Sequence, residues 1–224
     1  RSIVNGGMAV ANAAGQVRAQ ALQAGAELLE APLEDIELTN GQVRVKGSPK
    51  PALTLYDIAA ALANLSTQHS ALSTQHSLSA EALYSPPGVT YSGGVDAAVV
   101  EVDPDTGRVE VLRLVVVHDC GHVVNPTIVE GQMMGGTAQG IGGALYEELK
   151  YDEGCQLLTT SFMDYLLPTA MEVPDVTLDH QEYPTFRNAL GVKGLGEGGA
   201  IPVPALIANA VEDALRPFNV VVRE

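Results

Sequence analysis

The sequence predicts an α+β fold in which helices and strands are mixed without a regular βαβ alternation. Four stretches carry apolar residues at helical spacing, and β-rich runs bounded by turn residues lie between them. The 224 residues are 46% hydrophobic and 17% charged, a composition that excludes a disordered or fibrous chain. A chain of this length can bury a sizeable core in one large domain or two small ones.

The first third of the chain predicts two helices with a hairpin between them. After an initial loop, apolar positions over 8–30 follow a helical period. Asn40-Gly41 stands between two alternating runs and is typical of a type I′ turn, so 36–45 is predicted to be a hairpin. Thr54 is predicted to cap a short helix that follows it.

An internal repeat follows the second predicted helix. Two near-identical polar heptads over 66–80 have no face that could pack, which predicts an inserted low-complexity linker. His69 and His76 could bind a metal, but no third ligand is near them in the sequence. A solvated loop is the favoured interpretation.

The middle of the chain predicts two paired strands and a glycine-rich helix. The β-rich runs 97–102 and 109–117 flank a turn, and a helix is predicted over 127–149 after Asn125-Pro126. Each glycine in an exposed helix costs about 1 kcal/mol relative to alanine. The sequence therefore predicts that another helix or a ligand packs closely on this one, which contains Gly131, Gly135, Gly136, Gly140, Gly142 and Gly143.

The remainder of the chain is predicted to hold four further elements. These are a hairpin over 147–165, an irregular stretch over 168–184, a last helix over 202–215 and a short end strand over 220–222.

Composition excludes several classes of function. Lys+Arg 12 against Asp+Glu 27 gives a net charge of −15, and with Trp 0 and Phe 3 the chain is poorly suited to bind nucleic acid. No apolar run is long enough to span a membrane. Two cysteines and a start without a signal-peptide pattern predict a cytoplasmic protein.

The segment 191–199, Gly-Val-Lys-Gly-Leu-Gly-Glu-Gly-Gly, carries the strongest chemical signal. A phosphate-binding P-loop is excluded because Lys193 precedes the glycines. The segment also matches a dinucleotide-binding fingerprint, but no clean strand precedes it and two prolines open the helix that follows. Glu197, flanked by glycines, is either an exposed residue of a turn or a general base held against a bound cofactor.

Three weaker patterns leave alternatives open. The segment 118–122, His-Asp-Cys-Gly-His, is either a metal cluster or a strand-ending turn, and the absence of a second ligand pair favours the turn. Gln132 and Gln139 lie about two helical turns apart and could bind a polar ligand or cap a neighbouring loop. Arg1 and Ser2 precede the first helix and form a weak candidate anion site.

Taken together, three motifs resemble one enzyme family. Asp-Cys-Gly at 119–121, the glycine- and glutamine-rich run 130–147 and the loop 191–197 occur in the order found in the molybdopterin-binding subunit of the xanthine dehydrogenase and aldehyde oxidase family. The chain is most similar to the C-terminal part of that subunit in the aerobic carbon monoxide dehydrogenase type. The resemblance covers 1–224 apart from the repeat.

The resemblance implies a molybdenum hydroxylase that oxidises a carbon centre with oxygen taken from water. A pterin dithiolene holds the molybdenum, so no protein metal ligand is expected. Glu197 would accept the proton of the molybdenum-bound hydroxide as it attacks the substrate, within about 2.6–3.2 Å. Lys193 would favour the ionised form of that carboxylate. Hydride would pass to a sulfido ligand, and electrons would leave through iron–sulfur and FAD subunits.

The same resemblance implies where the cofactor is bound, with a cytosine dinucleotide as its expected form. Gly196 and Gly198 would let the backbone approach the metal centre. The implied cofactor contacts are Arg1, Ser2, Gln132, Gln139, Lys193, Gly194, Gly196 and Gly198.

The chain departs from the family pattern because upstream glycine-, arginine- and substrate-facing loops are absent. We therefore expect a fragment, or one half of a split subunit that is inactive alone and pairs with the N-terminal half, the iron–sulfur subunit and the FAD subunit. Carbon monoxide, an aldehyde, a purine and an N-heterocycle all remain candidate substrates. The alternatives are a non-catalytic assembly or interaction module of the same fold and, on the glycine fingerprint alone, a nicotinamide-dependent dehydrogenase.

Overall fold

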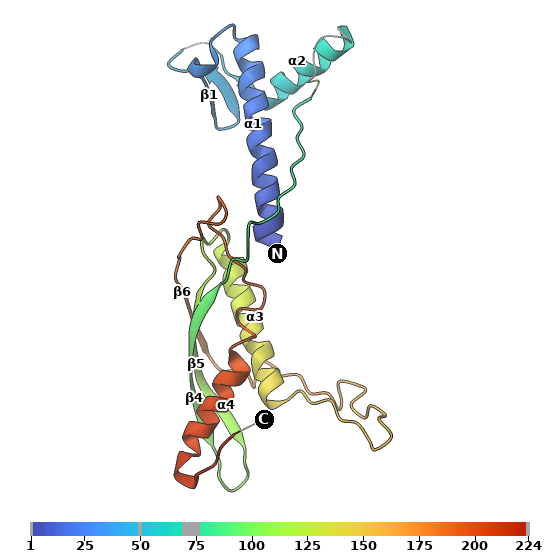
Figure 1. The fold of residues 1–224 in the computed structure, drawn as a ribbon, viewed down its shortest axis with the longest axis vertical. Coiled ribbons are helices and arrows are strands. Elements are labelled where there is room, and N and C mark those ends of the chain that lie inside the picture. Colours follow the sequence, from blue (N-terminus) through green and yellow to red (C-terminus); the bar gives the residue numbers. More distant parts are fainter. Residues whose placement is uncertain (1, 49–50, 69–76, 223–224) are drawn as a thin grey trace. The chain divides into compact units, whose positions relative to one another are not determined.

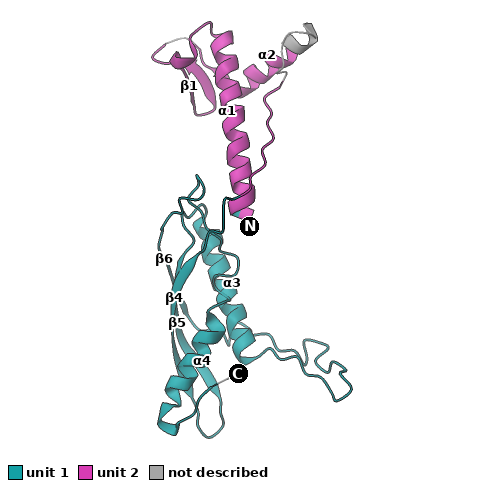
Figure 2. Ribbon diagram, in the orientation of Figure 1, with its two compact units in different colours: residues 1, 3, 86–224 teal, residues 2, 4–85 magenta. Residues whose placement is uncertain are grey.

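A computed structural model describes residues 2–48, 51–68 and 77–222, and the chain divides into two compact units. One unit comprises 4–85 with Ser2, and the other comprises 86–224 with residues 1 and 3 (Figures 1 and 2). Both units combine helices with antiparallel strands, and the second adds a parallel pair, which confirms the α+β class. Within the described residues, no helix is both long and apolar enough to cross a membrane.

The N-terminal unit opens with helix rather than with the predicted loop. Ser2–Gly7 forms a short π-helix that continues directly into α1 (Met8–Leu28), so the initial-loop prediction is wrong and the 8–30 helix is confirmed. A 3-10 turn at Leu33–Asp35 then leads to β1 (Ile36–Thr39) and β2 (Gln42–Val45). The sheet is completed by β3 (Leu53–Thr54), and α2 (Leu55–Gln68) follows.

Turn and cap chemistry in this unit follow the sequence. Asn40 and Gly41 both have positive φ, 51° and 74°, as the predicted type I′ turn requires. Thr54 Oγ1 accepts the main-chain N–H of Asp57 at 3.1 Å, while an Asp57 carboxylate oxygen accepts the N–H of Thr54 at 2.9 Å. This reciprocal pair is a capping box. The first three residues of the predicted linker, 66–68, belong to α2, and its residues 69–76 lie outside the described part of the chain.

A small core holds the N-terminal unit together. One face of α1 packs on the hairpin and on α2, and the buried residues are Ala21, Ala24, Ala26, Ile36, Val43 and Ile58. Small residues on α1 allow this close approach, because a Cβ at Gly25 would lie 2.4 Å from Cγ1 of Val43.

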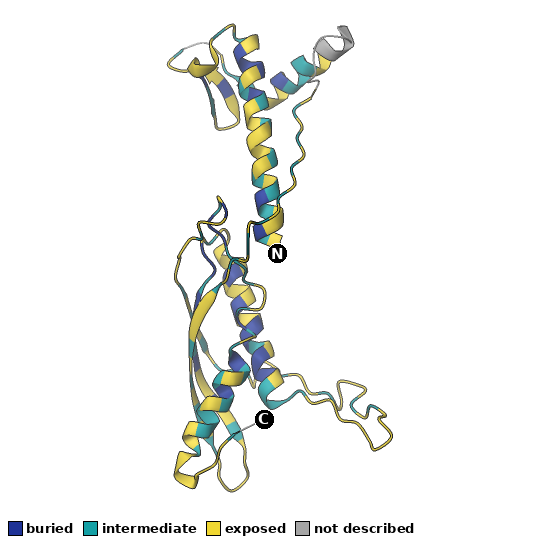
Figure 3. Ribbon diagram, viewed as in Figure 1, coloured by how far each residue is buried: buried dark blue, intermediate teal, exposed yellow. Residues whose placement is uncertain are grey.

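The second unit is a three-stranded sheet with two helices. β4 (Gly93–Val102) pairs antiparallel with β5 (Val109–Asp119), and β6 (Val176–His180) lies parallel to β5 on its other side. α3 (Pro126–Leu145) and α4 (Val203–Ala214) pack against each other, and α4 contacts β4 (Figure 1). Buried residues recur along α3 and the start of α4 (Figure 3).

The core of this unit lies between the sheet and the two helices. Its buried members are Val111, Leu114, Ile141, Val203 and Ile207. The start of α3 is set by Asn125, whose side-chain oxygen accepts the N–H of Ile128 at 3.3 Å, and Pro126 occupies the first helical position.

Three sequence predictions for this unit are wrong, and a fourth is confirmed in part. The predicted irregular stretch contains β6, and α3 ends at Leu145 instead of residue 149. The predicted 147–165 hairpin is present only as a short antiparallel bridge between Tyr151 and Leu157, with flanking hydrogen bonds from Asp152 N–H to Gln156 and from Leu158 N–H to Lys150. Residues 220–222 are not a strand, although the N–H of Val222 donates to Glu212 at 3.2 Å.

Candidate functional site

The glycine-rich segment 191–199 is anchored at its start to the end of β5. Gly121 forms an antiparallel bridge with Val192, and the N–H of Lys193 donates to the carbonyl of Cys120 at 2.8 Å. The buried Asn188 side chain donates to the Val192 carbonyl at 2.9 Å and accepts its N–H at 3.1 Å. Gly121 has a φ of +72°, and a Cβ there would lie 2.2 Å from the Gly191 carbonyl oxygen. The start of the segment is therefore rigidly placed.

The second half of the segment forms a tight turn that carries Glu197. The N–H of Gly198 donates to the carbonyl of Leu195 at 2.8 Å, and the Glu197 carbonyl accepts the N–H groups of Ala200 and Ile201 at 3.0 and 3.1 Å. The backbone of Glu197 is thereby held by hydrogen bonds, while its side chain is exposed. The geometry places this carboxylate on an ordered turn and leaves it accessible to a ligand.

Close backbone packing joins this turn to α3. A Cβ at Gly199 would lie 2.5 Å from the carbonyl oxygen of Met133, and one at Gly136 would lie 3.0 Å from Cα of Gly199. A Cβ at Gly140 would lie 2.6 Å from Cβ of Val203. The predicted close neighbour is confirmed at Gly140, where it is α4, a helix as predicted. At Gly136 the close neighbour is instead the backbone of the loop before α4.

A hydrogen bond brings one predicted ligand-binding amide to the turn. Gln132 Nε2 on α3 donates to the Gly196 carbonyl at 2.6 Å, although the two residues are 64 positions apart. The Gln139 side chain is exposed and, two helical turns further on, lies on the same face of α3 as Gln132. The interpretation of Gln132 as a cap of a neighbouring loop therefore holds in this structure.

The same face of α3 presents glycine backbone to its surroundings. Among the described residues, an added Cβ at Gly131, Gly135 or Gly143 would meet no atom within 4 Å, and the same is true of Gly194 and Gly196 in the turn. Groups of a ligand could therefore approach the main chain of both elements. Glycine backbone, two amide side chains and one exposed carboxylate fit a large polar cofactor.

Lys193 forms an ion pair with a residue of the neighbouring strand end. Its Nζ donates to a carboxylate oxygen of Asp119, and the two side chains are only 14% and 17% exposed. Burial alone would raise the pKa of Asp119, but the bonds from Lys193 and from the N–H groups of Gly121 and Tyr183 outweigh it and lower that pKa. The charge of Lys193 therefore stabilises the ionised form of Asp119. Its expected effect on Glu197 stays a prediction.

The segment 118–122 is a strand-ending turn. Asp119 Oδ1 accepts the N–H of Gly121 at 2.8 Å, which is the geometry of an Asx turn. His122 instead forms a 2.9 Å contact with Glu182, and the described residues contain no cluster of three potential metal ligands. Burial lowers the pKa of His118, against an opposing effect of Asp119, so its imidazole is neutral near pH 7.

Of the two N-terminal candidates, Ser2 belongs to the N-terminal unit, whereas the 191–199 segment belongs to the second unit. Ser2 is an exposed residue of the π-helix, and Arg1 lies outside the described residues.

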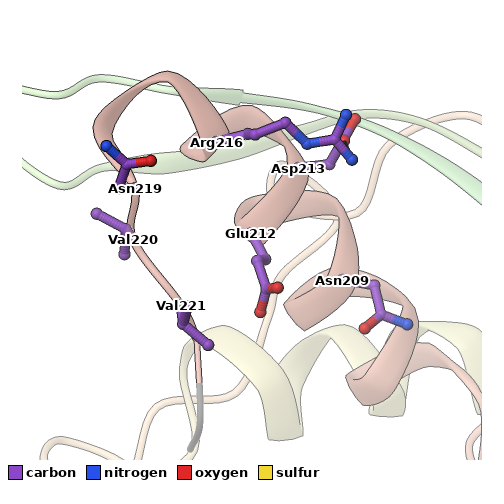
Figure 4. Close-up of a pocket in the computed structure, with 7 residues that line it drawn as sticks. All are labelled: Asn209, Glu212, Asp213, Arg216, Asn219, Val220 and Val221. Carbon is purple, nitrogen blue, oxygen red and sulfur yellow. Dashed lines mark ion pairs between the residues drawn. The ribbon is translucent and has the colours of Figure 1, made fainter.

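A separate hollow of about 480 Å³ lies between α4 and the following tail (Figure 4). Its lining residues, among them Glu212 and Arg216, include none from α3 or the 191–199 segment.

Sequence reasoning missed two contacts of the site. The buried imidazole of His118 packs against Gly198, and Asp119 binds Lys193 across 74 positions. One sequence signal for the Asp119–Lys193 contact was present: an Asp-x-Gly turn follows a predicted strand, and a lysine lies in the glycine-rich segment.

Comparison with known proteins agrees with this architecture. A family model described as a molybdopterin cofactor-binding domain matches residues 1–174. The chain is 41% identical, over 100% of its length, to the large subunit of nicotine 6-hydroxylase from Paenarthrobacter nicotinovorans, of which it covers 27%.

Two solved structures share the fold. A Cu,Mo-CO dehydrogenase matches 98% of the chain with a TM-score of 0.86 at 35% identity, and the match covers 27% of that protein. Quinoline 2-oxidoreductase from Pseudomonas putida 86 matches 92% of the chain with a TM-score of 0.81 at 40% identity and is itself covered over 26%. The chain spans about a quarter of the length of these relatives. The chain belongs to the molybdopterin cofactor-binding domain family of molybdenum-dependent oxidoreductases.

Proposed function

We propose that this chain supplies the base-bearing part of a molybdenum hydroxylase, with Glu197 as the general base. The observation that carries the proposal is the 2.6 Å bond from Gln132 to the Gly196 carbonyl. It places the open glycine face of α3 beside the turn that presents the exposed Glu197 side chain. A cofactor on that face would have a carboxylate at its edge.

The residues that would hold the cofactor come from both elements. Gln139 offers an exposed side-chain amide on the α3 face, and Gly194, Gly196 and Gly198 offer the backbone of the 191–199 segment. Arg1, Ser2, Gln132 and Lys193 are further proposed cofactor contacts. Lys193 also donates a hydrogen bond to Asp119. The dithiolene of the pterin would hold the metal, so this chain need not provide a metal ligand.

When bound, the molybdenum cofactor supplies the redox centre that oxidises a substrate carbon with oxygen derived from water. The work of this chain is proton transfer and positioning. A carboxylate oxygen of Glu197 accepts the proton of the water-derived hydroxyl group as the oxygen of that group bonds to the substrate carbon, so Glu197 must lie within hydrogen-bonding reach of that proton. The hydrogen bonds that hold the backbone of Glu197 limit the positions that this oxygen can take.

The complete enzyme needs more than this chain. We propose the remaining part of the large subunit, an iron–sulfur subunit and an FAD subunit as partners, and the cytosine dinucleotide as the cofactor form. The relatives' names cover nicotine, quinoline and carbon monoxide, so the substrate is to be found by assaying a panel that also includes purines and aldehydes. We expect the isolated chain to be inactive.

The experiment is to purify the chain from its source together with the proteins that accompany it. Molybdenum per chain and the nucleotide released from the cofactor are then measured. Stoichiometric molybdenum, cytidine nucleotide and a longer partner are the expected results. Absence of both molybdenum and partner would contradict the proposal and favour a non-catalytic module of the same fold.

A further inference from the structure

The imidazole of His118 is buried next to the turn that carries Glu197. His118 lies near the end of β5 and is only 6% exposed. Its Nε2 is buried and has no hydrogen-bond partner among the described residues. An unpartnered buried nitrogen is unfavourable, so this position is not explained by the needs of a stable core alone.

Two glycines enclose this ring. Gly94 on β4 is the register partner of His118, and a Cβ there would lie 3.1 Å from Nδ1 of the ring. On the other side, a Cβ at Gly198 would lie 2.5 Å from Cε1 and 2.7 Å from Nε2. The imidazole therefore fills the space between β4 and the backbone of the turn.

Gly198 also closes the turn that carries Glu197. Its N–H donates to the Leu195 carbonyl at 2.8 Å, and Glu197 is the residue directly before it. A displacement of Gly198 would therefore move the backbone from which the Glu197 side chain extends. The pKa of His118 is lowered chiefly by burial, which keeps the ring uncharged against this backbone.

We propose that His118 is a positioning residue for Glu197. Its ring packs between Gly94 and Gly198 and thereby fixes the position of the turn backbone that carries Glu197. This inference rests on the proposed function for the consequence in catalysis, but the packing contact itself does not. His118 does not touch the reacting atoms and acts only through Gly198. The two shortest contacts of an added Cβ at Gly198 are both to this ring, and the next is the Leu195 carbonyl oxygen at 3.2 Å. A methyl group added to Gly198 should therefore be largely tolerated once the ring is removed.

The test is a double-mutant cycle between His118→Ala and Gly198→Ala in the complete enzyme. Either change alone should raise amide hydrogen exchange over 195–199. Because a misplacement of about 1 Å can cost about 100-fold, each should also lower kcat by about 10- to 100-fold while KM changes by less than about 2-fold. In the double variant the methyl group occupies vacated space, and exchange and kcat should both return towards wild type.

Matched variants keep the test decisive. His122→Ala removes a histidine of the same segment whose side chain is exposed and paired with Glu182, so it should leave exchange over 195–199 and kcat unchanged. If His118→Ala fails to fold, His118→Val replaces it, because valine suits a β-strand. Wild-type exchange in the His118 variant, or single effects that simply multiply in the double variant, would overturn the proposal. Coupled exchange in an enzyme whose Glu197→Gln variant keeps full activity would instead confirm the contact and refute the proposed function.

Discussion

Replacing glycines of α3 with alanine should change the free energy of unfolding in opposite directions at different positions. The Cβ of an alanine at Gly135 would meet no described atom within 4 Å. The change in the free energy of unfolding is therefore set by the higher helix propensity of alanine alone. That preference stabilises the helix by about 0.8–1 kcal/mol. We expect the Gly135→Ala variant to be more stable than wild type by about this amount, and Gly131→Ala to behave in the same way.

Gly140→Ala should have the opposite effect. Its methyl group would lie 2.6 Å from Cβ and 2.9 Å from Cγ1 of Val203, a residue that is completely buried. Because Cβ of Val203 is itself in the way, no change of rotamer relieves the overlap. Overpacking of this kind costs about 1–3 kcal/mol, which exceeds the gain from helix preference.

Urea unfolding of the chain, followed by circular dichroism, measures both changes. Gly143→Ala serves as a further control, since its methyl group would also meet no described atom within 4 Å. The reasoning is refuted if Gly140→Ala is as stable as Gly135→Ala, because α3 would then not pack on α4 as the structure shows.

Three further outcomes follow from single side chains. The pKa of Asp119 is lower in the folded protein, so its stabilising effect is complete above about pH 4 and is lost as the pH falls through the folded pKa. The Asp119→Asn variant should be less stable than wild type at pH 7 by about 1–3 kcal/mol and should lose less stability in acid. Urea unfolding midpoints between about pH 2 and 7 measure both effects. Thr54→Ala removes the capping box of α2 and should cost about 1 kcal/mol in the same assay, whereas Thr54→Ser should retain most of it. A thiol reagent should label the exposed Cys155 at once and the buried Cys120, whose pKa is raised by burial, only after unfolding; equal rates in the native protein would contradict the structure.

Local signals predicted much of the fold because they depend on neighbours in the sequence. The Asn40-Gly41 turn, the Thr54 cap and the start of α3 after Asn125 all lie where the sequence places them. The strand β6 was missed because its residues alternate over only five positions and gain their meaning from pairing with β5.

The site was less predictable for the same reason. The partner of Lys193 is Asp119, and no spacing rule connects residues so far apart. The sequence did show that the glycines of α3 need a close neighbour, but only the structure separates Gly136 and Gly140, which pack on the loop and on α4, from Gly131 and Gly135, which face outward.

The most direct test of the central claim is the turnover of a Glu197→Gln variant at a molybdenum content equal to that of the wild type. Glutamine keeps the size of the side chain but cannot act as the base. If Glu197 is the general base, kcat should fall by about 100- to 10,000-fold while molybdenum and the partner proteins remain bound. A fully loaded variant that turns over at the wild-type rate would contradict the account.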